Sequence, residues 1–335
     1  MVGIGIIGTG YWGKNHIRNY KALLMEDQID YLKLCDKNEM RVRQIAEDYG
    51  LEFSSNIDDI KNDNKITAVV IVTPSSTHYE LSKKFLESGI DVFVEKPISL
   101  NSEEAKDLVE IAKKNNRILM VGHLFRYHSA VRDIKKRIDI GEFGKINMII
   151  TYRFALGVPR EDMGVVYALA VHELDLSCYL LNQDSPRSIL AEFARFHQEK
   201  VEEMANISMD FANGAKSYMM ESWNIPVYGK KRELIIIGSE KSAIIDYLIP
   251  NEYKIYDTKI KKQYIGNKTI LEREDNEISK IIIDYKEPLR EEILHFIRCI
   301  KNRENPETDG MVGYKAVLMC EAAFKSAKEN KRIFL

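Results

Sequence analysis

The chain has 335 residues, of which 45% are apolar and 30% are charged, and its formal net charge is −2. This length suits two domains, and the composition is typical of a globular protein. The nearly balanced charge argues against nucleic acid or an anionic membrane as a partner, and no apolar run reaches the roughly 20 residues that span a bilayer. We therefore expect a cytoplasmic protein.

The first predicted element is a short apolar strand over residues 2–7. It runs into a glycine motif and then into helical sequence; the motif reads Gly8-Thr9-Gly10-Tyr11-Trp12-Gly13. In such a motif the first glycine permits a tight turn, the second lets a pyrophosphate approach the backbone, and the third lets the helix pack on its strand. The helix N-terminus then favours the phosphates. The pattern predicts a dinucleotide site; the alternative is a turn that only connects strand and helix.

A second apolar strand, residues 31–35, ends in Asp36. This acid lies about 20 residues beyond the glycines, where an acid that binds the ribose is expected. A carboxylate accepts hydrogen bonds from both ribose hydroxyls and repels a 2′-phosphate, so we expect NAD as the cofactor and NADP as the less favoured one. Lys37 and Arg41 would soften that repulsion, or they simply begin a solvated helix.

Strand-like and helix-like segments alternate as far as residue 122. This alternation predicts a doubly wound parallel sheet, that is, a Rossmann domain over residues 1–122. Asn101 has the pattern of a helix N-cap, and Gly50 and Gly89 follow predicted helices as C-caps would. The predicted strands are 2–7, 31–35, 68–73, 91–94 and 118–121, and the predicted helices include 39–49, 77–88 and 102–115.

Two short polar motifs follow strands of this domain, at the sheet edge where ligands bind in open α/β sheets. One runs from Thr73 and Pro74 to His78, and the other is Glu95-Lys96-Pro97. A lysine beside an oxidised nicotinamide faces a cationic ring, which disfavours its ammonium form and lowers its pKa toward the range of an acid/base group. Lys96 is therefore a candidate catalytic residue; the alternative is an ordinary loop lysine.

Beyond residue 122 the pattern changes to a helix over 130–138 and then to runs with a period of two. It predicts a second domain over residues 123–335, an α+β domain with a large, mostly antiparallel, open sheet that ends in two helices. Residues 253–279 are charged and irregular and read as surface strands or a loop. The predicted strands are 145–154, 189–196, 205–211, 216–222, 233–237 and 242–247, and the closing helices are 289–300 and 311–329.

The four cysteines lie far apart in apolar segments: Cys35, Cys178, Cys299 and Cys320. This spacing predicts reduced, buried thiols, with no metal site and no disulfide framework.

Taken together, the motifs resemble those of the Gfo/Idh/MocA oxidoreductases over nearly the whole chain. The resemblance rests on the glycine motif, Thr73-Pro74, Glu95-Lys96-Pro97, Gly122-His123-Leu124-Phe125-Arg126-Tyr127 and Val171-His172-Glu173-Leu174-Asp175. It implies hydride transfer between NAD(P) and a sugar or cyclitol carbon, and assembly through the open sheet into a homodimer or homotetramer. It assigns Lys96 and His172 as catalytic. It also implies a cofactor-binding set of Gly8, Gly10, Tyr11, Trp12, Gly13, Asp36, Thr73, Pro74, His78, Glu95, Lys96 and Pro97.

One position departs from the family pattern. Many members have an aspartate four residues before the histidine, one helical turn away, and this chain has Ala168 there. The partner that orients His172 is then missing, or is supplied by Asp175, Glu173 or the substrate. The run over 164–172 is similar to that of the UDP-N-acetylglucosamine 3-dehydrogenase branch of the family. This narrower resemblance implies oxidation at C3 of a UDP-linked N-acetylhexosamine.

Three arginines, Arg126, Arg153 and Arg160, fall in segments expected to border the cleft, where a guanidinium suits a pyrophosphate. With Tyr152 and Asp175 they form the expected substrate contacts; the alternative for the arginines is surface charge. Two rival functions stay open. One is a free-sugar or inositol dehydrogenase of the same family. The other is a non-catalytic dinucleotide sensor that binds a protein through the open sheet, which would predict loss of Lys96 and His172.

Overall fold

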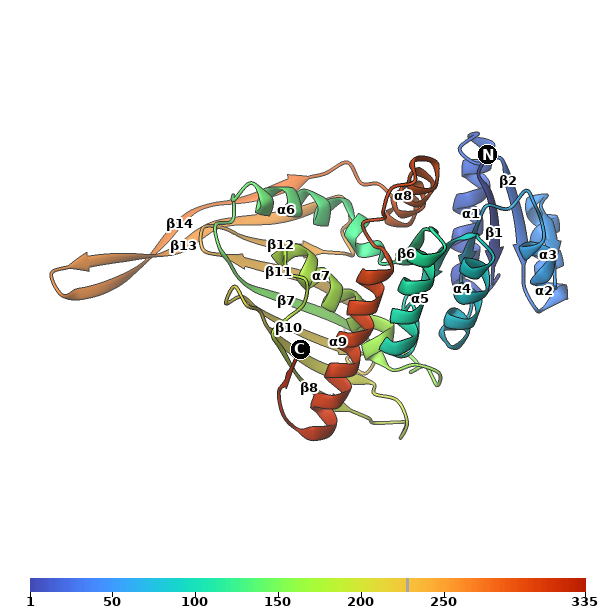
Figure 1. Cartoon of the computed structure of the whole chain (residues 1–335). Helices are drawn as coiled ribbons and strands as arrows, with labels where there is room; N and C mark the ends of the chain where they lie inside the picture. The colour runs from blue at the N-terminus through green and yellow to red at the C-terminus, as the bar shows by residue number, and fades with distance from the viewer. Residues whose placement is uncertain (227–228) are drawn as a thin grey trace. The chain divides into compact units, whose positions relative to one another are not determined.

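Six parallel strands form the sheet of the N-terminal part of the chain, in the order β3-β2-β1-β4-β5-β6. This confirms the predicted doubly wound sheet. The order reverses between β1 and β4, and ligands bind at such a switch point. The strands are β1 (Gly3–Ile7), β2 (Tyr31–Cys35), β3 (Glu52–Ser54), β4 (Ala68–Ile71), β5 (Asp91–Glu95) and β6 (Leu119–Gly122). The structure, a computed structural model, describes residues 1–226 and 229–335 (Figure 1).

Helices connect these strands, and their ends follow the predicted signals. Asn38 and Asn101 cap α2 and α5, since their side chains accept hydrogen bonds from backbone N–H groups three residues on. Gly50 ends α2 in the left-handed conformation. The helices are α1 (Tyr11–Met25), α2 (Glu39–Tyr49), α3 (Asp58–Lys61), α4 (His78–Glu87) and α5 (Ser102–Lys114), with a 3₁₀ turn η1 (Ser75–Thr77).

The chain returns to this first unit near its end. The unit comprises Met1–Leu124 and Glu287–Leu318, so it includes α8 (Pro288–Asn302) and the beginning of α9 (Gly310–Glu329). The Phe296 ring of α8 packs on that of Phe93 in β5, with 5.6 Å between ring centres. The apolar spacing of α8 predicts a buried face but does not show which sheet covers that face. The sequence therefore did not predict that α8 packs in the first unit.

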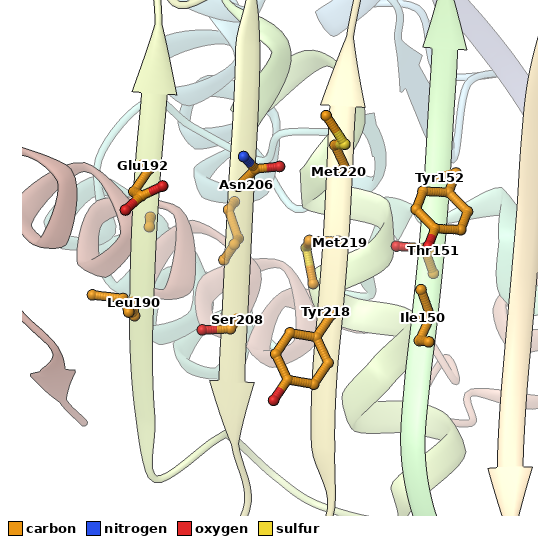
Figure 2. A pocket seen from close by; sticks show the side chains of 12 residues that line it. Ile150, Thr151, Tyr152, Leu190, Glu192, Asn206, Ser208, Tyr218, Met219 and Met220 are labelled. Carbon is orange, nitrogen blue, oxygen red and sulfur yellow. The ribbon is translucent and has the colours of Figure 1, made fainter.

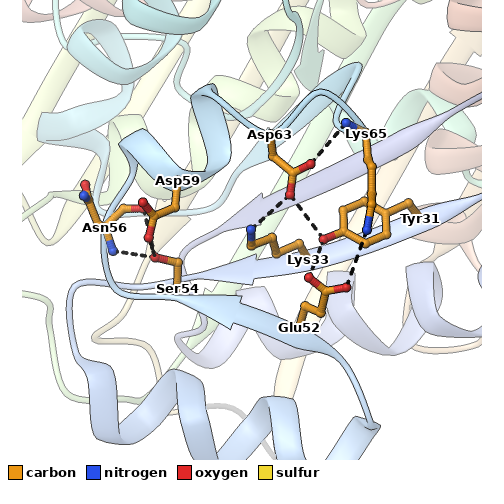
Figure 3. A network of polar contacts seen from close by, with 8 residues as sticks. All are labelled: Tyr31, Lys33, Glu52, Ser54, Asn56, Asp59, Asp63 and Lys65. Atoms are coloured by element: carbon orange, nitrogen blue, oxygen red, sulfur yellow. Dashed lines mark hydrogen bonds and ion pairs between the residues drawn. The ribbon is translucent and has the colours of Figure 1, made fainter.

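A network of polar contacts lies at the edge of the first sheet, around strands β2 and β3, as Figure 3 shows. The Tyr31 hydroxyl lies 2.8 Å from a Glu52 oxygen and 3.2 Å from an Asp63 oxygen, and the Lys33 ammonium donates to Asp63 at 3.0 Å. Burial and then the bond to Glu52 raise the pKa of Tyr31. The Lys65 ammonium lies 4.7 Å from the centre of the Tyr31 ring. These charges protect an edge strand from pairing with another chain.

The second unit, Phe125–Lys286 with Met319–Leu335, contains a nine-stranded sheet in the order β14-β13-β12-β11-β7-β10-β9-β8-β15. All neighbours are antiparallel except β7 and β10, which confirms the mostly antiparallel sheet. The strands are β7 (Ile146–Ala155), β8 (Ser188–Ala194), β9 (Met204–Asp210), β10 (Lys216–Ser222), β11 (Lys230–Gly238), β12 (Ser242–Asp246), β13 (Glu252–Ile265), β14 (Lys268–Ile282) and β15 (Ile333–Phe334).

Helices cover one face of this sheet and leave the other face open (Figure 1). The covering helices are α6 (Ser129–Asp139), α7 (Val171–Leu181) and the last part of α9. In β7, Thr151 and Arg153 are buried on the covered face, whereas Ile150 and Tyr152 alternate onto the open face. The charged segment that the sequence left as strands or a loop forms the hairpin β13–β14.

The four cysteines are buried free thiols, as predicted. The side chains in the described ranges include no group of three or more His, Cys, Asp or Glu that could hold a metal ion. Of the helices that the structure describes, none combines the length and apolar character of a membrane span.

Candidate active site

The glycine motif forms a tight turn between β1 and α1. A side chain at Gly8, where φ is +102°, would place its Cβ 2.5 Å from the Val72 carbonyl oxygen, and one at Gly13 would lie 2.2 Å from the Gly8 oxygen. Gly10 faces open space instead. Gly10 is also the N-cap of α1, and because glycine has no side chain it cannot cap the backbone amides of the first turn. The turn therefore has the room and the backbone amides that a pyrophosphate needs.

Asp36 is buried at the end of β2 and is tied to this turn. One carboxylate oxygen accepts from the Thr9 backbone N–H at 2.7 Å and from its hydroxyl at 2.9 Å. Arg41 donates to both oxygens at 2.8 Å. Burial by itself would raise the pKa of Asp36, but the hydrogen bonds from Thr9, Asn38 and Arg41 outweigh it and hold the pKa below its usual range. Asp36 is thus a charged acceptor beside the glycine turn, with a guanidinium next to it.

Glu95 links the first helix to the segment that carries Lys96. The Trp12 indole N–H donates to Glu95 at 2.7 Å, and His16 Nε2 lies 2.8 Å from the same oxygen. Burial opposes ionisation of Glu95, but the bond and charge of His16 and the bond from Trp12 lower its pKa overall. A side chain at Gly122 would place a Cβ 2.9 Å from this carboxylate. A fixed, ionised Glu95 therefore immediately precedes Lys96 at the end of β5.

His78 joins the two polar motifs of the first unit from within. It is buried, and its ring nitrogens lie 2.7 Å from the Pro97 carbonyl oxygen and 2.9 Å from that of Thr73. Burial lowers the pKa of His78. Its ring supports both loops and is not presented to solvent. Tyr11, by contrast, is 89% exposed.

In the second unit, His172 lies in the first turn of α7 and is buried. The preceding residues form a π-helical turn, η3 (Val166–Ala170). A π-helical turn contains an extra residue and is common at functional sites. Residue 168 therefore does not lie one regular α-helical turn before His172. Ala168, which stands where many family members have an aspartate, is placed differently relative to His172 than it would be in a continuous α-helix.

Phe125 and a buried ion pair surround His172. The His172 and Phe125 rings meet edge to face with centres 4.9 Å apart, and the Arg153 guanidinium carbon lies 4.0 Å from the Phe125 ring centre. Arg153 in turn forms an ion pair with Glu173, the residue after His172, and both side chains are almost fully buried. Burial would lower the pKa of Arg153, but the Glu173 charge raises it overall. The arginine expected to contact substrate thus lies beneath α7, with Glu173 as its partner.

Glu221 is a buried acid beside this ion pair, and no motif in the sequence pointed to it. It is opposite Arg153 in the β7–β10 register. Its carboxylate has no hydrogen-bond partner among the residues that the structure describes. Burial, and then the charge of Glu173, raise its pKa well above the usual value. The inward alternation of Ser217, Met219 and Glu221 in β10 was the signal that could have revealed it.

The remaining predicted substrate residues lie in three places. The Arg126 guanidinium donates to Asp175 through Nε at 2.8 Å and also through Nη2. Arg160 is exposed and pairs with Asp162 at 2.6 Å. Tyr152 lies on the open face, where it helps to line a cavity of about 330 Å³ (Figure 2). The structure therefore gathers Arg153 and Glu173 near His172, pairs Arg126 with Asp175, and places Tyr152 on the opposite face of the sheet from Arg153.

Comparisons with known proteins match both parts of the chain. Residues 2–123 match the model of the oxidoreductase family with an NAD-binding Rossmann fold, and residues 135–335 match its C-terminal alpha/beta domain. A scyllo-inositol 2-dehydrogenase (NAD(+)) of Bacillus subtilis is 28% identical over 321 residues, covering 91% of this chain and 88% of that protein.

Two further similarities concern other sugars. A UDP-N-acetylglucosamine 3-dehydrogenase of Acidithiobacillus ferrooxidans is 28% identical over 245 residues, which cover 73% of this chain and 74% of that protein. A solved levoglucosan dehydrogenase, in complex with NADH and levoglucosan, has the same fold, with a TM-score of 0.86, 21% identity and coverage of 99% of both chains.

Proposed function

The chain belongs to the Gfo/Idh/MocA oxidoreductase family, and we propose that it oxidises a secondary alcohol of a sugar with NAD, at C3 of a UDP-linked N-acetylhexosamine. Its N-terminal part is an NAD-binding Rossmann domain, and its relatives include dehydrogenases of inositols and of a nucleotide sugar. The family therefore supports the reaction class, while the substrate is our inference.

The cofactor would be held by the glycine turn, the N-terminus of α1 and Asp36. Bound NAD supplies the hydride acceptor. Lys96 and His172 are the proposed acid/base pair: one takes the hydroxyl proton and the other stabilises the oxygen as negative charge develops on it. Glu95 and His78 would fix the loops around Lys96, and Phe125 would fix the ring of His172.

The observation that carries the choice of substrate is the segment before His172, which has Ala168 in place of an aspartate and forms a π-helical turn. A nucleotide sugar has a large remote group whose binding energy can align the reacting carbon. A histidine that lacks an orienting aspartate is then tolerable. Arg126 and Arg160 are the proposed contacts of the diphosphate. The nucleotide-sugar relative supports this choice.

An inositol or free-sugar dehydrogenase is the second candidate. The observation that favours it is the inositol relative, which aligns with 91% of this chain against 73% for the nucleotide-sugar relative.

A substrate screen separates the candidates. The purified protein is given NAD with UDP-N-acetylglucosamine, free N-acetylglucosamine, glucose or myo-inositol, and NADH formation is recorded. We expect the highest kcat/KM with the nucleotide sugar. An equal or higher kcat/KM with a free sugar or cyclitol would establish the second candidate. NADH binding without oxidation of any of them would favour a dinucleotide sensor.

We also propose that the protein is a homodimer or homotetramer that assembles through the open face of the second sheet. Large apolar side chains lie on that face around the cavity, among them Tyr152, Tyr218 and Met220 (Figure 2). Exposed apolar side chains that gather on one sheet face are typical of an interaction surface.

A further inference from the structure

The distal part of the β13–β14 hairpin, residues 258–275, is an arm that has no other strand beside it among residues 1–226 and 229–335. β12 pairs with β13 only at Lys254–Tyr256, and beyond this point β13 pairs only with β14 (Figure 1). The two strands have 14 and 15 residues, and an isolated two-stranded hairpin is marginally stable in water. The arm therefore calls for a surface that stabilises it.

Three of the arm's five large apolar residues share one of its faces. Cross-strand partners share a face, and the register pairs Ile260 with Arg273, Leu271 with Lys262, and Tyr264 with Thr269. Ile260, Leu271 and Tyr264 are 61%, 63% and 74% exposed. The opposite face of the arm carries Ile265 and Ile270.

The register connects the apolar face of the arm to the open face of the sheet. One row of paired residues runs from Ile150, which lines the open-face cavity, through Ile235 and Ile244 to Lys254. The alternation of β13 continues from Lys254 to Ile260 and Tyr264, because the extra residue at the register shift lies on β14. Ile278 and Ile282 of β14 lie on this same face nearer the sheet, because they pair with Tyr256 and Glu252 of β13. Both are more than 60% exposed. We call Ile260, Tyr264, Leu271, Ile278 and Ile282 the arm stripe.

We propose that the arm stripe docks on a second copy of this chain and extends the open-face interface. This inference rests on the homo-oligomer proposed above. A like copy fits better than nucleic acid or an anionic membrane, because the chain's formal net charge is −2 and three of the arm's five basic side chains are paired with carboxylates. These pairs are Lys259 with Glu240, Lys261 with Glu274, and Arg273 with Asp275. A two-fold contact would cover the stripes of both copies at once, since the same patch on each subunit takes part.

The experiment compares two isoleucines of the arm that are equally exposed but lie on opposite faces. Ile260→Glu changes the stripe, and Ile265→Glu is the matched control, because both side chains are 61% exposed. The oligomer of the full chain is measured by sedimentation velocity over a range of concentrations. We expect Ile260→Glu to raise the dissociation constant about tenfold or more, the effect of losing a buried interface contact. Ile265→Glu should leave it within about threefold of wild type, as expected of a residue outside the interface core.

Further variants separate this inference from the proposed function. Tyr218→Glu tests the open face without the arm. If Tyr218→Glu dissociates the oligomer while Ile260→Glu and Leu271→Glu do not, the arm does not dock on a second copy. A monomeric wild type, or equal effects of Ile260→Glu and Ile265→Glu, also overturns the inference. If the stripe variants dissociate but wild type oxidises no sugar, the proposed function fails and the arm inference stands. Circular dichroism confirms that each variant is folded.

Discussion

The Arg153 guanidinium carbon lies 4.0 Å from the centre of the Phe125 ring, whose edge-to-face neighbour is the imidazole of His172. A guanidinium over an aromatic face contributes about 0.5–2 kcal/mol, with the larger values at desolvated sites. Arg153 is almost fully buried and forms an ion pair with Glu173. The ring of His172 is therefore held by a packed side chain whose own position depends on a buried ion pair.

This contact predicts that Phe125 positions His172. Phe125→Leu keeps an apolar side chain but removes the flat ring, so the imidazole gains freedom. We expect kcat to fall by about 10²-fold, the cost of misplacing a catalytic group by about 1 Å, with a much smaller change in KM. Steady-state kinetics with the best sugar substrate measures both values. Phe193→Leu, which removes a ring that packs on Phe324, is the control. An equal loss of kcat in both variants would mean a general effect on the fold.

Lys96 and His172 are predicted to act in the reaction, and their replacement should leave cofactor affinity largely intact. Lys96→Ala and His172→Ala should each lower kcat by about 10²–10⁴-fold, the typical contribution of acid/base catalysis. Titration with NADH should give dissociation constants close to that of wild type. Near-normal turnover in either variant would leave that residue with a structural role only.

Much of the first unit could be predicted because its signals are local. A strand, a glycine turn and a helix with its cap are specified by neighbouring residues, and Asp36 follows at a known spacing. The return of α8 depends on packing against β5, which no local pattern encodes. The charged hairpin β13–β14 was equally hard to assign, since its side chains beyond Tyr253 and Ile255 alternate without a buried face.

The surroundings of His172 could be predicted only in part. An apolar run fits an α-helix and a π-helix equally well, so the sequence could not predict the π-helical turn η3. Strand alternation would have placed Arg153 and Tyr152 on opposite faces, but it could not say that Glu173 neutralises the arginine. These pairings arise from residues distant in the chain, and only the fold brings them together.

Cofactor preference should depend on the Asp36–Arg41 ion pair. Asp36→Ala removes the acceptor of the ribose hydroxyls. It also frees Arg41, which in the wild-type chain donates to both oxygens of the Asp36 carboxylate. We expect weaker NADH binding and tighter NADPH binding, because a guanidinium suits a phosphate. Fluorescence titration with both nucleotides measures this. In the double variant Asp36→Ala/Arg41→Ala the gain for NADPH should disappear. If wild type binds NADPH as tightly as NADH, Asp36 does not contact the ribose.

Glu292 on α8 should make stability depend on pH. It is buried, and its carboxylate has no hydrogen-bond partner within the described part of the chain. Burial, and then the charge of Glu95, raise its pKa well above the usual value. In the unfolded chain a glutamate loses its proton near pH 4.3. Between these two pKa values the folded state binds more protons than the unfolded state.

The slope of the unfolding free energy with pH is proportional to the number of protons bound by the unfolded state minus the number bound by the native state. That difference is negative between the two pKa values, so the free energy of unfolding falls as pH rises through this window. The contribution of Glu292 is complete below the unfolded pKa and is lost as pH rises toward the folded pKa. Glu292→Gln cannot ionise, so its stability relative to wild type should increase from pH 5 to pH 8. Urea unfolding at several pH values measures this difference. A constant difference between Glu292→Gln and wild type would mean that Glu292 titrates alike in both states.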